Sequence, residues 1–368
     1  MALKVNIPLV RPTLVPWEEV EADFREVWES GQLTVGNHTR EFEEAICKVT
    51  DAKFAVAVSS CTSGLMLLLR ALEITKEVII PSFTWASTGH ALVWNNIVPV
   101  FADCLPGIYT LDPEDVARKI SPRTQAIFAA NVFGVHPDID ALQKVADAAG
   151  IPLLCDSAQA IGATYKGRNA GSTCLAEVFS FSPTKVVTAV EGGLITTDDA
   201  DLADKLRRMR DYGKSSDGKD VELFGMSARI SELHSIVGKK NLTRYRELIE
   251  RRGKIAARYR EAFRDIEGMR FQETPAQYES SHNYFVTFHP RRDQLEAHLT
   301  DRGIQTKRYF YPPLHKQKSY ACLALPDQKL PVTEQACAES LALPFFSHIT
   351  DEQVSQVIDA VLEFFSKK

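Results

Sequence analysis

The sequence predicts an α/β fold in which a large domain has a mostly parallel central sheet covered by helices, followed by a smaller C-terminal α+β domain. From Lys53 to Asp156, near-continuous apolar segments alternate with amphipathic ones, as in parallel strands buried between two helix layers. An apolar stripe at helical spacing then runs from Ile230 to Phe263. Short strand and helix patterns follow it. We therefore expect a large domain over residues 1–245, including an N-terminal arm, and a small domain over residues 246–368.

The elements are predicted in chain order as follows. Residues 16–30 read as a helix, and a second helix begins at about Arg40 after the loop GQLTVGNHT. Apolar strands are then expected at residues 54–60, 77–84, 97–104, 124–134 and 151–156, with helices between them at 61–72, 85–96, 112–120 and 141–150.

The second half of the chain carries further strand and helix patterns. Phe179 and Phe181 alternate with serines, which predicts a half-buried strand that Pro183 ends. Gly192 opens another strand, GGLITT. Because glycines interrupt the long apolar stripe, we expect two helices or one bent helix there. Thr350 and Gln353 have the spacing of a capping box for the last helix.

Composition excludes several function classes. The net charge of −5 over 368 residues argues against nucleic-acid binding by bulk electrostatics. We find no signal-peptide pattern, no apolar run of about 20 residues that would span a membrane, and no motif for a metal. The seven cysteines are scattered and form no C-x-x-C, which fits a reducing cytoplasm better than a disulfide framework or a zinc site.

Two charged residues at predicted strand ends indicate a catalytic site. Asp156 ends the apolar run IPLLCD, and Lys185 follows the strand that contains Phe179. A lysine is most often a surface residue. However, ligands of such sheets lie at the carboxyl ends of the strands, and an amine desolvated there becomes neutral and able to condense with a carbonyl. An amine and a carboxylate at this edge are what pyridoxal phosphate needs for its aldehyde and its ring nitrogen.

Other polar or aromatic residues lie at the same predicted edge. Thr62 and Ser63 stand where a strand gives way to a helix, so they are either ordinary helix caps or part of an anion site at the helix start. Trp85 follows the next strand, as a core residue or as a platform for a ring.

Three motifs carry a resemblance to a known family. SSCTSGL at residues 59–65, CDSAQAIG at 155–162 and SFSPTK with EGG at 180–193 occur in the order and spacing of the DegT/DnrJ/EryC1/StrS aminotransferases. The chain resembles this family over nearly its whole length. The resemblance implies the type I fold of pyridoxal-phosphate-dependent transferases and an enzyme that aminates sugars.

The resemblance also implies roles for individual residues. Lys185 would bond covalently to pyridoxal 5′-phosphate and move protons, with pyridoxamine 5′-phosphate as the aminated form, and Asp156 would keep the ring nitrogen protonated. Cofactor contacts are expected at the phosphate from Thr62, Ser63 and Ser180, at the ring face from Trp85, and at the ring hydroxyl side from Gln159. Candidates for the sugar-nucleotide site are Leu33, Thr34, Tyr311 and His315.

Two positions depart from the family pattern. Ser182 stands where the family often has a bulkier or imidazole side chain. Ser227, in GMSARISE, stands where an asparagine usually reaches the phosphate in the partner subunit of a homodimer. Serine is shorter, so a water would have to bridge that contact.

The expected reaction moves an amino group from L-glutamate to C4 of a nucleotide-linked 4-keto-6-deoxyhexose, in a cytoplasmic homodimer with active sites at the subunit interface. Three alternatives stay open: amination at C3, amination of an inosose, and a non-catalytic sugar-nucleotide-binding relative. The two serines at the departing positions favour the last.

Overall fold

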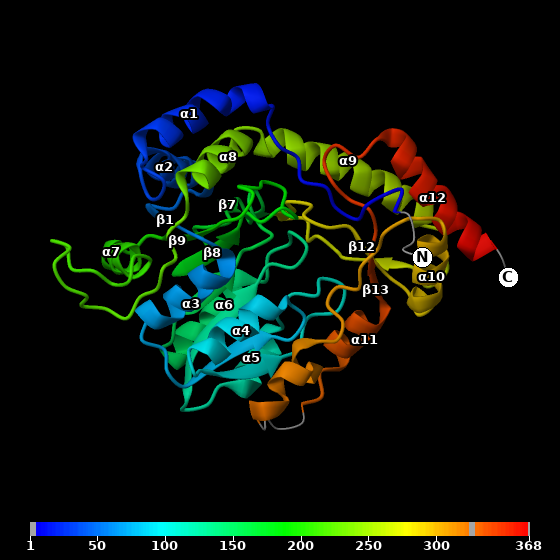
Figure 1. Cartoon of the computed structure of the whole chain (residues 1–368). Coiled ribbons are helices and arrows are strands. Elements are labelled where there is room, and N and C mark those ends of the chain that lie inside the picture. The colour runs from blue at the N-terminus through cyan, green and yellow to red at the C-terminus, as the bar shows by residue number, and fades with distance from the viewer. Residues whose placement is uncertain (1–4, 324–327, 367–368) are drawn as a thin grey trace.

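The computed structural model describes residues 5–323 and 328–366, so the outermost residues of the two expected domain ranges lie outside the described part. Its largest feature is a seven-stranded sheet (Figure 1). β9 runs antiparallel to both of its neighbours, and the other neighbouring pairs run parallel. The expected mostly parallel sheet is confirmed. In spatial order the strands are β1 (Phe54–Val58), β9 (Gly193–Thr197), β8 (Ala176–Ser180), β5 (Leu153–Asp156), β4 (Thr124–Ala130), β2 (Glu77–Pro81) and β3 (Val98–Ala102).

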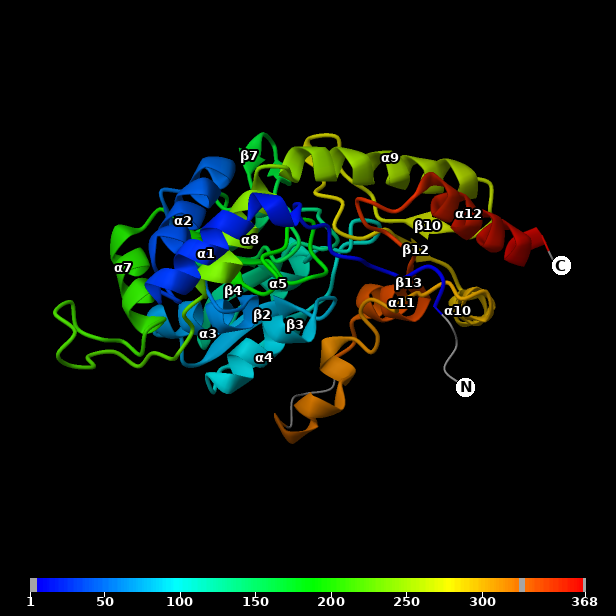
Figure 2. The same ribbon diagram turned by 45° about the horizontal axis from the view of Figure 1, so that its top comes forward.

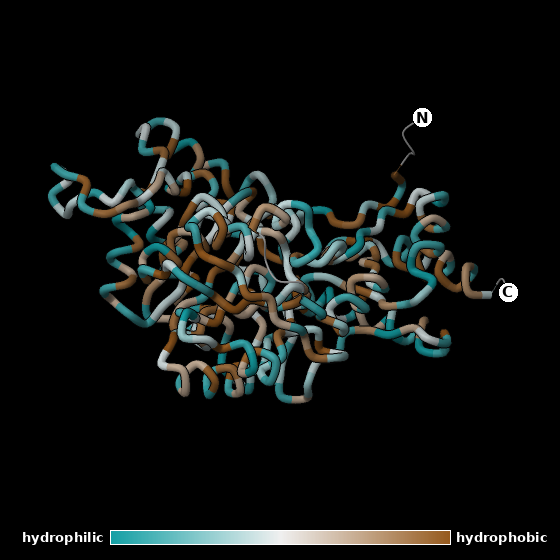
Figure 3. The backbone as a smooth tube through the Cα atoms, turned by 90° about the horizontal axis from the view of Figure 1, so that it is seen from below, coloured by the Kyte–Doolittle hydropathy of each residue, from teal (hydrophilic) through white to brown (hydrophobic). Residues whose placement is uncertain are grey.

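Helices cover both faces of this sheet because successive strand residues point to opposite sides. Val78 and Ile80 pack with α3, α4 and α7, whereas Ile79 packs with α5 and α6. Long apolar stretches cross the middle of the large body in the hydropathy view (Figure 3). These helices are α3 (Cys61–Ala71), α4 (Ala86–Trp94), α5 (Pro113–Lys119), α6 (Ile139–Ala149) and α7 (Ala200–Met209).

The apolar stripe after Ile230 forms two helices, α8 (Glu232–Leu242) and α9 (Tyr245–Phe263), which is one of the two expected arrangements. α9 leads from the large sheet to a small antiparallel sheet (Figure 2). Its apolar face packs with α10 and α12 in a separate core. The elements here are β10 (Arg270–Phe271), β12 (Val286–Phe288), β13 (Ser340–Ala342), α10 (Arg292–Asp301), α11 (Pro331–Glu339) and α12 (Asp351–Ser366).

Smaller elements complete the described chain. β6 (Thr164–Tyr165), β7 (Arg168–Asn169) and β11 (Tyr278–Glu279) form a third sheet. Two short 3₁₀ segments, Leu314–Lys316 and Lys318–Leu323, precede α11. Within the described ranges no helix is both long and apolar enough to traverse a lipid bilayer.

The N-terminal helices differ from the sequence expectation in detail. The predicted helix at residues 16–30 is a 3₁₀ turn, Trp17–Glu19, followed by α1 (Glu21–Ser30). The next helix, α2 (Asn37–Thr50), begins three residues earlier than expected. Its first N–H groups are bound by the buried Glu232 carboxylate, which accepts from Gly36, His38 and Thr39 at 2.8–3.0 Å. A cap supplied from so far along the chain extends the helix without a local sequence signal.

Candidate active site

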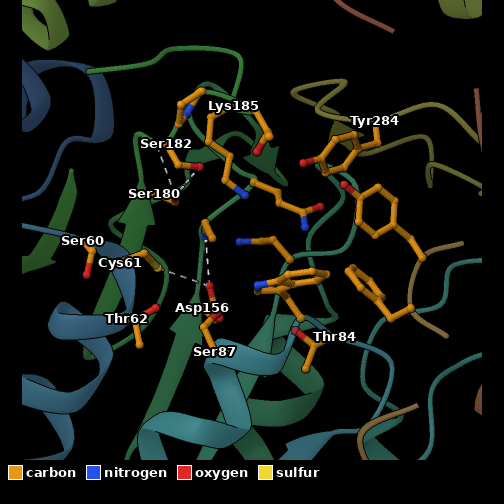
Figure 4. Close-up of a pocket in the computed structure, with 18 of the residues that line it drawn as sticks. Ser60, Cys61, Thr62, Thr84, Ser87, Asp156, Ser180, Ser182, Lys185 and Tyr284 are labelled. Carbon is orange, nitrogen blue, oxygen red and sulfur yellow. Dashed lines mark hydrogen bonds between the residues drawn. The ribbon is translucent and has the colours of Figure 1, made fainter. Parts of the chain in front are cut away.

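A cavity of about 380 Å³ opens at the carboxyl ends of the central strands. It is lined by the start of α3, the start of α4, the end of β5 and the segment from Ser180 to Gly192. Four residues from later in the chain close its other side: Tyr284, Lys307, Tyr309 and Phe310. Figure 4 shows side chains from both parts pointing into this space.

Asp156 is the last residue of β5 and lies at the cavity wall with its side chain buried. Its Oδ2 accepts a 2.6 Å hydrogen bond from the Thr88 hydroxyl, and its Oδ1 accepts from the backbone N–H of Ala158 at 3.2 Å. Burial raises the pKa of this carboxyl, although both hydrogen bonds and the charge of Lys185 oppose the rise. Because Asp156 is buried and the Lys185 charge lowers its pKa, a further positively charged N–H group arriving in the cavity would also stabilise the ionised form.

Lys185 reaches the same cavity from the turn that follows β8. Its backbone N–H donates to the Ser182 carbonyl at 3.1 Å, which holds the turn. β8 ends at Ser180, three residues before Pro183, so the strand is shorter than the alternating phenylalanines suggested. The structure thus places the amine and the carboxylate in one cavity, as the sequence predicts (Figure 4).

The N-terminus of α3 forms another wall. Thr62 lines the cavity in the first turn of this helix, where backbone N–H groups lack partners within the helix. Ser63 does not line the cavity. It forms a capping box with Ser60, in which the Ser63 N–H donates to Ser60 Oγ and the Ser60 N–H donates to Ser63 Oγ, both at 3.1 Å. The Ser63 side chain therefore has the ordinary capping role, and its contact with a phosphate stays a prediction.

Hydroxyl groups face the helix start from across the cavity. Ser180 and Ser182 both line it, with their Oγ atoms 3.3 Å apart. The strand that follows them must pass close to α3. A Cβ on Gly193 would lie 2.3 Å from the Ser60 carbonyl carbon, so only glycine fits there. This close approach explains the second glycine of the EGG motif, Gly193.

Trp85 and Gln159 complete the expected lining. Trp85 precedes α4 and is 50% exposed, so it is a wall of the cavity and no core residue. The Lys307 ammonium lies 4.6 Å from its ring centroid. Gln159 is buried, and its Oε1 accepts from the Phe133 N–H at 2.7 Å, which fixes the amide at the cavity edge.

Besides Ser63, five predicted residues are not among those that line this cavity in the described chain. Leu33 and Thr34 lie on an exposed loop, and Ser227 is exposed beside Arg229. Tyr311 is 54% exposed and lies outside. His315 packs its ring in the interior, where Nδ1 pairs with Ser82 Oγ at 2.7 Å. The structure does not bring these residues to the site of this chain.

Sequence reasoning missed several lining residues. Tyr284 lies in the segment NYFVTF, which has a strand pattern, and Lys307 and Tyr309 lie in the aromatic segment KRYFYPP. Asn131 lies in a stretch that reads as buried strand. Each is separated from Lys185 by at least fifty residues or by an apolar pattern, so no local signal marks it. The hydroxyl of Thr88, on α4, was missed for the same reason.

The lining residues fit pyridoxal 5′-phosphate. The buried Asp156 carboxylate suits a ring N–H, and the Lys185 amine suits an aldehyde. A helix start flanked by Thr62, Ser180 and Ser182 suits a phosphate. The indole of Trp85 offers a flat face for a ring.

Comparisons with known proteins agree with this fit. The sequence model of the DegT/DnrJ/EryC1/StrS aminotransferase family matches residues 17–362. The chain is 35% identical over 344 residues to the erythromycin biosynthesis sensory transduction protein EryC1 of Saccharopolyspora erythraea, covering 92% of this chain and 93% of that protein. It is 33% identical over 349 residues to dTDP-3-amino-3,4,6-trideoxy-alpha-D-glucose transaminase of Streptomyces venezuelae, covering 94% of this chain and 92% of the relative.

Solved structures show the same fold. The structure of DesI in the presence of its TDP-sugar product superposes with a TM-score of 0.93 at 35% identity, covering 98% of this chain and 93% of DesI. The sugar aminotransferase Spr1654 from Streptococcus pneumoniae, in a form that contains PLP, superposes with a TM-score of 0.92 at 25% identity. The superposed region covers 98% of this chain and 99% of the Spr1654 chain.

Proposed function

The chain belongs to the DegT/DnrJ/EryC1/StrS aminotransferase family, and on that premise we propose that it transfers an amino group from L-glutamate to C4 of a nucleotide-linked 4-keto-6-deoxyhexose. The observation that supports this proposal is the convergence of one amine, one buried carboxylate and one helix start on a single cavity. Lys185, Asp156 and Thr62 come from three separate segments, and amino transfer with pyridoxal 5′-phosphate needs all three.

When bound, pyridoxal 5′-phosphate supplies an aldehyde that takes up amino groups and a ring that withdraws electrons. The chain's own residues would supply the rest. Asp156 would accept the ring N–H and hold its positive charge, while the first turn of α3 and the nearby serines bind the phosphate. Trp85 would stack on the ring. The Lys185 amine would move protons between the bound substrate and the cofactor inside the cavity.

A second candidate is amination at C3. It is favoured by one observation, the 33% identity to a relative named as a transaminase that forms a 3-amino sugar. The cavity residues do not discriminate between the two ring positions. The third alternative, a non-catalytic sugar-nucleotide-binding relative, is less well supported, because the cavity retains Lys185 and Asp156 together.

The test is an assay of the purified protein with L-glutamate and TDP-4-keto-6-deoxyglucose, and separately with a 3-keto isomer. We expect 2-oxoglutarate to form together with an amino sugar, whose nitrogen position is read by NMR. The Lys185→Ala variant should keep the fold by circular dichroism and lose about 10²–10⁴-fold or more in rate, the range of a positioned acid–base group. Full activity of this variant would refute the assignment of Lys185.

We also propose a homodimer that works in the cytoplasm. Leu33, Thr34 and Ser227 are exposed and lie outside the cavity of their own chain. Residues in such positions are free to contact the active site of a second copy. All seven cysteines are free thiols, as expected in a reducing compartment. Sedimentation of the purified protein tests the dimer.

A further inference from the structure

One lysine of the cavity has no role in the chemistry described above. In the described chain, the charged side chains that line the cavity are Asp156, Lys185, Glu191 and Lys307. Lys185 and Asp156 would serve the aldehyde and the ring nitrogen of the cofactor. Lys307 comes from the opposite wall, which the later part of the chain supplies. Both proposed substrates are anions, so this second cation is a candidate for binding one of their charged groups.

The backbone fixes where the Lys307 side chain begins. Its N–H donates to the Ala342 carbonyl at 3.3 Å and its carbonyl accepts from the Ala342 N–H at 2.8 Å, which anchors Lys307 as an antiparallel bridge to β13. The next cation along the chain, Arg308, is already paired: it donates to Glu296 and forms an ion pair with Asp293. Of the two neighbours, Lys307 is the one whose side chain lines the cavity.

Aromatic rings hold the Lys307 ammonium at the cavity wall. Nζ lies 4.6 Å from the ring centroid of Trp85 and 4.9 Å from that of Tyr309, and these two rings meet edge to face with centroids 6.3 Å apart. Among the described residues, the partners found for the ammonium are these rings and not a carboxylate. A cation–π contact at a partly exposed site is weaker than a charge-assisted hydrogen bond. A carboxylate that enters the cavity can therefore take the ammonium from the rings.

The position of the ammonium favours one anionic group over the others. Trp85 is the expected platform for the cofactor ring, so a cation over the same indole lies near the reacting carbon. In an α-amino acid, the α-carboxylate is bonded directly to the carbon that gives up its amino group. In a nucleotide-linked hexose, the sugar ring separates the keto carbon from the diphosphate. A cation beside the cofactor ring is therefore better placed for the amino acid.

We propose that Lys307 binds the α-carboxylate of the amino donor and thereby restricts the donor to α-amino acids. The contact is a charge-assisted hydrogen bond that replaces the ring contacts of the ammonium. It orients the donor and makes or breaks no covalent bond. Because it concerns the donor of the amino group, this assignment rests on the proposed function.

The first test measures binding without turnover. Glutarate has the two carboxylates of glutamate and no amino group, so it can occupy the donor site without reacting. It is titrated calorimetrically into the full-length protein loaded with pyridoxal 5′-phosphate. We expect binding to the wild type, affinity about 10-fold lower or more in Lys307→Met, and recovery in Lys307→Arg, which keeps the charge. Equal affinity of wild type and Lys307→Met, or no binding to the wild type, would overturn the proposal.

Two controls separate this role from a general effect of charge or folding. The Lys307 side chain is exposed and its backbone hydrogen bonds remain in both variants, so they should fold. Lys316→Met removes a lysine that lies outside the cavity and pairs with Glu334, and should leave the affinity for glutarate unchanged. TDP should bind Lys307→Met as tightly as it binds the wild type. A greater loss for TDP than for glutarate would assign the cation to the diphosphate and overturn the proposal.

The second test identifies the carboxylate that is bound. 4-Aminobutyrate keeps the amine and the distal carboxylate of glutamate but lacks the α-carboxylate. We expect Lys307→Met to lower kcat/KM for L-glutamate about 10-fold or more, mainly through KM, while KM for the keto sugar and the rate with 4-aminobutyrate stay the same. An equal loss with both donors would overturn the assignment of the α-carboxylate. If the wild type shows no amino transfer, the proposed function fails, but glutarate binding still decides whether Lys307 holds a carboxylate.

Discussion

At the scale of single residues, the site depends on how a buried carboxylate is kept ready for a ligand. Asp156 is 5% exposed and accepts hydrogen bonds from the Thr88 hydroxyl, the Ala158 N–H and, at 4.0 Å, the Cys61 thiol. Burying an acceptor of this kind is costly unless its hydrogen bonds are made. Thr88 is itself fully buried, and its hydroxyl donates to Asp156 and pairs with the Thr84 hydroxyl at 3.0 Å.

Removing the Thr88 hydroxyl should therefore weaken both stability and the cofactor site. Thr88→Val keeps the side-chain shape but leaves one oxygen of Asp156 without its 2.6 Å donor. We expect the free energy of unfolding to fall by about 1–3 kcal/mol, and the pKa of Asp156 to rise further. Urea unfolding measures the loss of stability, and calorimetric titration with pyridoxal 5′-phosphate measures the weakening of the cofactor site. Thr84→Val is the matched control for stability, since Thr84 contacts Thr88 and not Asp156; equal losses in both variants would contradict this account.

The raised pKa of Asp156 also predicts how stability depends on pH. Its ordinary value is 3.8, and burial raises it in the folded protein. Between these two values the unfolded chain ionises while the folded chain stays protonated, so the contribution of Asp156 to stability is full below 3.8 and is lost as the pH rises through the folded pKa. Asp156→Asn has no such loss.

We therefore expect the cofactor-free Asp156→Asn variant to gain stability relative to wild type as the pH rises above about 4. Denaturant unfolding at a series of pH values measures the difference. A difference that stays constant across this range would show that burial does not raise the pKa of Asp156. At neutral pH the variant should be inactive in amino transfer. Asp156 would then lower the stability of the cofactor-free protein while being required for activity.

At the scale of elements, helix starts show what a sequence can and cannot reveal. The capping box of α12 uses Thr350 and Gln353, three residues apart, and both of its hydrogen bonds are present at 3.1 Å. That cap was predicted from its spacing. The cap of α2 comes from Glu232, almost two hundred residues along the chain, and no local pattern could reveal it.

Glu232 also ties the loop at residues 31–36 to the start of α8. Glu232→Ala leaves the N–H groups of Gly36, His38 and Thr39 without their acceptor. Because hydrogen bonds to a charged group contribute about 1.5–3 kcal/mol each, we expect a loss of about 3 kcal/mol or more in unfolding free energy. KM for the sugar nucleotide should rise if Leu33 and Thr34 contact it. Glu44→Ala, at an exposed position on α2, is the control. A similar loss of unfolding free energy in Glu44→Ala would argue against the cap.

At the scale of the whole molecule, the sequence predicted one half of the cavity and missed the other. Strand ends are local features, so an apolar run followed by Asp156 or a turn with Lys185 can be recognised, and parallel order brings them to one edge. The opposite wall depends on how the small domain packs on the large one. Tyr284 and Tyr309 look like ordinary buried aromatics in their own segments, and only tertiary structure brings them to the cavity that Lys185 lines.

Some predicted site residues lie outside the cavity of their own chain, and their role depends on how two copies assemble. Leu33, Thr34 and Ser227 are exposed, although the family resemblance gives them ligand contacts. Exposure in the single chain and ligand contact are compatible if each copy of a dimer places these residues at the cavity of the other copy. In a two-fold symmetric dimer, a contact that one copy makes is also made by the other. The alternative is that these residues serve no site.

A mixed dimer distinguishes these possibilities. Lys185→Ala removes the amine but keeps the loops, and Leu33→Glu combined with Ser227→Glu places charges on the loops but keeps the amine. Each protein alone should be nearly inactive. When the two are unfolded together and refolded in equal amounts, half of the dimers are mixed and each has one intact site, so about a quarter of wild-type activity should return. Loops that serve their own chain would give no recovery, and full activity of the loop variant alone would show that these residues take no part in the reaction.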